Sequence, residues 1–135
     1  MTDAARNLAI WHDYIANSHG STEKLAEILH DDCVFHSPVV HTPQRGKPIV
    51  MAYLTAAGGT LGQSNFNYVR EMADGPNVML EFTAEMDGIH VNGIDLMTFD
   101  EDGLITDFKV MVRPLKAVNK VWEQMGAALE KMKAG

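Results

Sequence analysis

Cysteine is nearly absent from the chain, since Cys33 is the only one in 135 residues. A single thiol excludes an internal disulfide and a zinc site built from several thiolates. Two acidic residues precede it in the run DDCVFH, and nearby negative charge raises the pKa of a thiol. We therefore expect an unreactive cysteine and a fold that an apolar core stabilises without disulfides.

Long apolar runs and basic clusters are also absent. No stretch approaches the ~20 apolar residues that cross a membrane, and the start MTDAARNLAI lacks the pattern of a signal peptide, so we expect a cytoplasmic protein. Eleven Lys and Arg stand against 18 Asp and Glu, which gives a formal net charge of -7. This charge argues against nucleic acid as a partner, and the lack of a long apolar run argues against a membrane.

The histidines show no spacing typical of a metal site. None of the six forms a pair such as HxxxH, and His12, His19, His30 and His90 fall on expected surfaces or turns. We therefore expect no metal and no cofactor.

Four segments have the apolar spacing of amphipathic helices. Asp3 can cap the first, which runs to about Asn17, and Ser21 can cap a short second helix. Pro48 lies near the start of a third, and Pro114 opens the last. The apolar stripe of the first helix consists of Ala4, Leu8, Trp11 and Ile15.

Between the last two helices the apolar period changes from helical to two, which predicts strands. The expected strands of this region are the segments 65–72, 77–86, 89–99 and 104–113. Another short strand, CVFHSP, is expected between the second and third helices and is stopped by Pro38. DG at 87–88 and DEDG at 100–103 predict hairpin turns. Helices followed by a meander of antiparallel strands and a final helix predict an α+β domain, with a curved sheet folded around the helices.

One carboxylate lies in an apolar strand. In GIDLMTF, strand alternation puts Asp95 on the same face as Met97 and Phe99. A lone carboxylate there is costly unless it is hydrogen-bonded, so Asp95 is either a pocket acid or a structural acid bonded to Tyr14 or to backbone. Tyr14 lies beside the apolar stripe of the first helix, which suits a pocket residue or simple packing.

Three stretches carry a family resemblance: LHDDCVFHSP, RGKPIVMAYL and GIDLMTFDEDGLITDFKVMVRP. In this order and spacing they resemble the nuclear transport factor 2-like superfamily, and within it the SnoaL-like proteins and ketosteroid isomerase. The resemblance implies one SnoaL-like domain over residues 1–135, with a cone-shaped, cystatin-like α+β fold whose curved antiparallel sheet wraps around the N-terminal helices. It also implies an apolar pocket and a homodimer formed through the outer face of the sheet.

The resemblance also implies roles for particular residues. Asp95 matches an aspartate that ketosteroid isomerase keeps neutral in its oxyanion hole, and Tyr14 looks like the tyrosine of that site. The isomerase's general base precedes the proline of the short strand, but here Ser37 precedes Pro38. A serine cannot abstract a carbon-bound proton without its own base, so His36, His41 or a bound water would have to move it. Strand alternation points His36 to the opposite face, whereas His41 in the following loop could reach over the mouth of the pocket.

Two functions stay open at this point. The first is a cofactor-independent enzyme of the isomerase, cyclase or dehydratase type, acting on a small apolar or cyclic ligand, and the second is a non-catalytic dimeric protein that binds such a ligand. Large apolar residues are most simply core, and some of them must line any pocket. These residues are Trp11, Phe35, Tyr53, Leu54, Phe66, Leu80, Phe82, Met97, Val110 and Val112.

Overall fold

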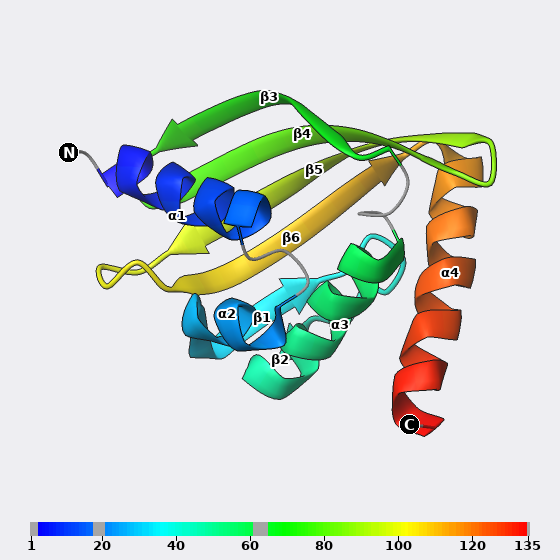
Figure 1. Cartoon of the computed structure of the whole chain (residues 1–135), viewed down its shortest axis with the longest axis horizontal. Coiled ribbons are helices and arrows are strands. Elements are labelled where there is room, and N and C mark those ends of the chain that lie inside the picture. Colours follow the sequence, from blue (N-terminus) through cyan, green and yellow to red (C-terminus); the bar gives the residue numbers. More distant parts are fainter. Residues whose placement is uncertain (1–2, 18–20, 61–64, 135) are drawn as a thin grey trace.

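The computed structural model describes residues 3–17, 21–60 and 65–134 (Figure 1). The elements follow in the order α1 (Asp3–Asn17), α2 (Thr22–Glu27), β1 (Leu29–His36), β2 (Gln44–Arg45), α3 (Lys47–Thr60), β3 (Asn67–Asp74), β4 (Asn77–Met86), β5 (Ile89–Phe99), β6 (Ile105–Arg113) and α4 (Leu115–Ala134). The expected α+β class is confirmed. None of the described helices has the length and apolar character needed to cross a membrane.

Six strands form one sheet in the order β2-β1-β6-β5-β4-β3. All neighbours are antiparallel except β1 and β6, which run parallel because the chain passes through α3 and the meander before it returns. The two-residue strand β2 was not among the expected strands, since two residues carry no readable period. In Figure 1 helices α1, α2 and α3 lie on one side of the curved sheet, and α4 stands at one end of it.

A local signal accounts for the start of α2. The Ser21 hydroxyl accepts a hydrogen bond from the Lys24 N–H at 3.2 Å, which is the N-cap that the sequence predicts for α2.

The buried face of α1 differs from the expected apolar stripe. In α1 the buried residues are Asn7, Trp11 and Tyr14, whereas Leu8 of the expected stripe is only partly buried. The buried face therefore includes Tyr14, which was expected to lie beside it.

Two of the three hairpin turns of the meander hold α1 in place. The Arg6 guanidinium donates to the carbonyl oxygens of Asp100 and Glu101 in the β5–β6 turn, at 3.0 and 2.8 Å. The buried Asn7 amide donates to the Gly75 carbonyl oxygen in the β3–β4 turn at 3.4 Å. Because these contacts fix the start of α1 against the sheet, they also position Trp11 one turn further on.

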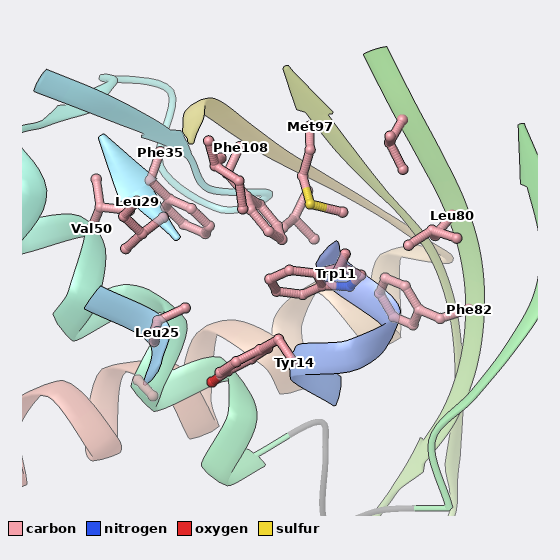
Figure 2. Packing of buried hydrophobic residues seen from close by; sticks show 14 of the residues in the cluster. Trp11, Tyr14, Leu25, Leu29, Phe35, Val50, Leu80, Phe82, Met97 and Phe108 are labelled. Carbon is pink, nitrogen blue, oxygen red and sulfur yellow. The ribbon is translucent and has the colours of Figure 1, made fainter. Parts of the chain in front are cut away.

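Period-two alternation holds along β4 and β5 as expected. Val78, Leu80, Phe82, Ala84 and Met86 of β4 are all buried. On β5 the buried positions run from Val91 to Phe99 in steps of two and include Asp95. Figure 2 shows the side chains of this core packed between the sheet and the helices.

Cys33 belongs to this core. It is buried, and burial is the main cause that raises the pKa of its thiol, with smaller contributions from the charges of Asp31 and Asp32. This direction agrees with an unreactive cysteine.

Candidate functional site

A cavity of about 510 Å³ lies between the helices and the inner face of the sheet. Its wall is rich in aromatic side chains, which come from α1, β1, β3, β4 and β6 and from the residue just before β3. The aromatic residues of this wall are Trp11, Tyr14, Phe35, Phe66, Tyr68, Phe82 and Phe108. Cavities of roughly 300–1,000 Å³ with apolar walls and few polar groups are typical of small-molecule sites.

Asp95 lies in the wall of this cavity. It pairs with Leu80 of β4 on one side and Val110 of β6 on the other, and only 7% of the residue is exposed. Burial disfavours the carboxylate and raises the pKa of Asp95 to about 7, although the hydrogen bond from Tyr68 partly opposes this. Both protonation states are therefore populated near neutral pH.

Two side chains form a hydrogen-bonded chain that ends on Asp95. The Tyr68 hydroxyl donates to Asp95 Oδ2 at 2.6 Å, and Trp11 Nε1 donates to the Tyr68 hydroxyl oxygen at 3.0 Å. Burial and the neighbouring Asp95 charge raise the pKa of Tyr68 well above its ordinary value, so the phenol keeps its proton. Tyr68 therefore acts as a hydrogen-bond donor toward the carboxylate.

Tyr68 is the site residue that the sequence interpretation missed. It stands two residues after Phe66 in the run NFNYVREM, and alternation puts both on one face of this extended segment, although β3 itself begins at Asn67. Their rings pack edge to face with centroids 5.0 Å apart. This alternation was the available signal, but the weak apolar pattern of the strand hid it.

Tyr14 also lines the cavity but does not bond to Asp95. Its ring packs against Trp11 with centroids 5.2 Å apart. Figure 2 shows the Tyr14 hydroxyl on the side of the ring that faces away from Phe82 of β4. Of the alternatives open for Asp95, a hydrogen bond from Tyr14 is not the one that forms, because β3 supplies the phenol through Tyr68.

Ser37, His36 and His41 do not belong to the described cavity wall. The Ser37 hydroxyl accepts a hydrogen bond from the Val39 N–H at 3.1 Å within a turn. His36 faces away, as alternation predicts, and its Nε2 lies 2.8 Å from Asp107 Oδ1. His41 is exposed. The structure therefore does not bring these three residues together with Asp95.

Of the ten apolar residues expected to line a pocket, six do so: Trp11, Phe35, Leu54, Phe66, Phe82 and Val110. Leu80 and Met97 are instead fully buried behind the wall, and the Tyr53 ring packs on Phe35. Val112, also expected, is partly buried near the end of β6, outside the wall. Helix α4 adds Val121 and Met125, which sequence alternation could not assign to the cavity.

The charge on the wall is sparse. Among the described lining residues, Asp95 carries the only charged group, and Tyr14 and Tyr68 are the other titratable ones. Within the described part of the chain, no three histidine, cysteine or acidic side chains cluster closely enough to hold a metal ion. Asp95 and its neighbours are suited to proton transfer and hydrogen bonding at this site.

Comparison with known proteins agrees with this architecture. Residues 11–108 match the family model of the SnoaL-like domain, and the chain therefore belongs to the SnoaL-like family. The chain is similar to a steroid delta-isomerase from Pseudomonas aeruginosa at 39% identity, covering 100% of this chain and 97% of that one with a TM-score of 0.89. No protein of curated function matches the sequence.

Two further solved structures share the fold. A bacterial protein with a cystatin-like fold from Silicibacter pomeroyi is 31% identical over 90% of this chain and 83% of that one, with a TM-score of 0.80. A SnoaL-like polyketide cyclase from Jannaschia is 11% identical over 90% of this chain and 94% of that one, with a TM-score of 0.71. At that identity the last likeness concerns the fold alone.

Proposed function

We propose that this protein is a cofactor-independent enzyme that moves a proton within a neutral, ring-containing carbonyl compound, as an isomerase does. The observation that carries the proposal is Asp95, a carboxyl group with a pKa of about 7 in the wall of an aromatic cavity. A group that titrates near the working pH is suited to proton transfer. The sparse charge of the described wall favours a neutral ligand over an anionic one.

A β,γ-unsaturated ketosteroid is the ligand class that this proposal favours. Its flat fused rings suit a wall of aromatic side chains, and its carbonyl activates the adjacent C–H bonds for proton transfer. The similarity to the Pseudomonas aeruginosa steroid delta-isomerase supports the same class.

The first test is binding and turnover of 5-androstene-3,17-dione. Trp11 lines the cavity while Trp122 is exposed, so the Trp122→Phe variant reports on the cavity by fluorescence. We expect the steroid to change the Trp11 emission, and we expect the conjugated enone product to appear by its ultraviolet absorbance. Binding without turnover would identify a ligand-binding protein, which is the alternative function. Neither binding nor turnover would contradict the proposed ligand class.

We further propose a homodimer formed through the outer face of the sheet. Neighbouring strands align Met72 with Met79 and Met111 with Ile94 on this face, and Thr83 lies there as well. Met72 and Met111 are more than half exposed, and exposed apolar surface of this kind marks an interaction site.

Sedimentation velocity at micromolar concentration is expected to show a dimer for the wild type and a monomer for Met111→Glu. The substitution puts a charge into the centre of the apolar face. Ile49→Glu on α3 is the matched control, because Ile49 is also exposed but lies on a helix on the other side of the sheet. A monomeric wild type would refute the dimer.

A further inference from the structure

Moving a proton between two carbon atoms requires a group that takes it and gives it back. Ser37 stands where the resemblance implies a base, yet its hydroxyl is engaged by the Val39 N–H and does not line the cavity. Histidine, which most often does this work, does not occur on the described wall. The proton carrier must therefore come from another position if the proposed function holds.

We infer that Asp95 is the proton carrier of the site, with Tyr68 and Trp11 as the residues that position it. This inference rests on the proposed function and assigns Asp95 a role opposite to that of a neutral hydrogen-bond donor. Asp95 would act in its ionised form, and the carboxylate would contact the ligand's C–H bond directly.

The direction of the hydrogen bonds supports this assignment. The indole N–H of Trp11 can only donate, so the Tyr68 oxygen accepts from it. The Tyr68 proton is then directed at Asp95 Oδ2, where it stabilises the carboxylate. Because this hydroxyl is already committed, Tyr68 is not placed to donate to a ligand oxygen as an oxyanion-hole tyrosine would.

The other oxygen of Asp95 remains for the ligand. Among the described residues, Tyr68 is the only hydrogen-bond partner of the Asp95 side chain, and it occupies Oδ2. Oδ1 is therefore the atom that can accept a proton from a molecule in the cavity. The same atom can return the proton to a second carbon without any other acid or base.

For a β,γ-unsaturated ketone the step balances within the ligand. Asp95 takes the proton from the α-carbon, the C–H bond breaks, and its electron pair forms the enolate. The carboxylic acid then protonates the γ-carbon, the enolate electrons restore the carbonyl group, and the double bond ends in conjugation with it. Asp95 leaves the cycle as the carboxylate, and no oxidant, reductant or cofactor is consumed.

The surroundings of Asp95 decide how this group titrates. Tyr68 of β3 and Tyr14 of α1 are the titratable groups that share the described wall with it. The neighbouring β4 and β6 contribute Phe82, Phe108 and Val110, and the helices α3 and α4 add no charged side chain to that wall. The apolar surroundings disfavour the carboxylate and Tyr68 favours it, so Asp95 is available as a base close to neutral pH.

The direction of the pH profile distinguishes the two roles. With 5-androstene-3,17-dione as the substrate, kcat/KM is expected to rise as pH increases through the pKa of Asp95, because the carboxylate is the active form. Asp95→Asn should lower kcat by about 100- to 10,000-fold, since an amide can donate a hydrogen bond but cannot take a proton. Asp107→Asn is the matched control, because this carboxyl lies outside the cavity and pairs with His36; its activity should be unchanged.

Tyr68→Phe and Trp11→Phe test the positioning role. Tyr68→Phe removes the hydrogen bond to the carboxylate and should move the rising limb of the profile to higher pH by about one unit. Trp11→Phe removes only the hydrogen bond that orients Tyr68, so its shift should have the same direction and be smaller. A carbon NMR titration of the Asp95 carboxyl group in the free proteins should show the same order of shifts. A purely structural effect of either substitution would lower activity at every pH and leave the limb where it is.

Three outcomes would overturn the inference. A kcat/KM that falls as pH rises through the Asp95 pKa, or an active Asp95→Asn variant, would assign Asp95 the donor role and leave the proposed function standing. Unshifted profiles and titrations in both positioning variants would remove Tyr68 and Trp11 from the mechanism. A wild type that binds the ketone but is inactive at every pH would overturn the proposed enzyme together with its proton carrier.

Discussion

At about pH 8, replacing Asp95 with asparagine is expected to raise the free energy of unfolding by about 2–4 kcal/mol. Above neutral pH the folded wild type holds a carboxylate in an apolar wall with a single hydrogen-bond donor, Tyr68. The amide of the variant keeps the shape and can still accept the Tyr68 hydrogen bond, but it carries no charge to desolvate. The stability gained in this way would accompany the loss of the proton carrier.

The pH dependence follows from the direction of the shift. The pKa of Asp95 rises from 3.8 to about 7 on folding, so the folded state holds the proton more tightly than the unfolded state. The contribution of the neutral acid to stability is complete below about pH 4 and is lost as pH rises toward the folded-state pKa of about 7. The wild type should therefore lose stability across this window, while Asp95→Asn should not lose this contribution.

Urea unfolding at several pH values measures both effects. Asp102→Asn is a suitable control, because Asp102 is exposed in the β5–β6 turn and its replacement should leave the pH dependence as it is. Equal stability of the wild type and Asp95→Asn at pH 8 would show that the cavity solvates the carboxylate well, and would contradict the raised pKa.

The second large effect is expected at Gly93, where alanine should lower the free energy of unfolding by about 3 kcal/mol. A Cβ at this position would lie 2.4 Å from Phe82 Cζ and 2.6 Å from the Met111 carbonyl oxygen, which is too close for a real contact. Gly93 pairs with Phe82 across the β4–β5 ladder, so the Phe82 ring lies over the glycine and reaches the cavity wall. The Phe82 ring would have to move, and the backbone at Met111 with it.

Gly126→Ala is the matched control for this prediction. Gly126 lies in α4 and no atom outside its own helix neighbourhood lies within 4 Å of a Cβ built there. Alanine is the better helix former, so this variant should gain about 0.5–1 kcal/mol. Thermal and urea unfolding of both variants provide the comparison, and a Gly93→Ala protein as stable as the wild type would contradict the close packing.

The link between Gly93 and Asp95 explains why GIDL is informative as a motif. Two residues apart on β5, they share the inner face of the sheet, and both are buried. Gly93 makes room for the Phe82 ring of the cavity wall, and Asp95 supplies the only charged group among the described lining residues. Asp95 costs folding stability, and Gly93 tolerates no side chain. Such departures from the usual rules of stability are typical of functional sites.

Elements that depend on local signals were predictable from the sequence. The N-cap at Ser21, the period-two strands β4 and β5, and the hairpin between them depend on neighbouring residues, and the structure has all of them. The same alternation predicted that Asp95 faces inward and His36 outward. Strand β2 was missed because a strand of two residues is formed by its partner β1 and not by its own pattern.

What the sequence by itself determined is the set of inward-facing residues, because alternation in a strand and spacing in a helix need only the neighbouring residues. It could not select the partners of Asp95. The three residues of the hydrogen-bonded chain come from α1, β3 and β5, and the separation of 57 residues between Trp11 and Tyr68 carries no local signal. Only the curvature of the sheet, its register and the docking of α1 on the β3–β4 and β5–β6 turns brought Tyr68 rather than Tyr14 to the carboxyl group. Non-local packing decides which of two inward-facing phenols reaches Asp95.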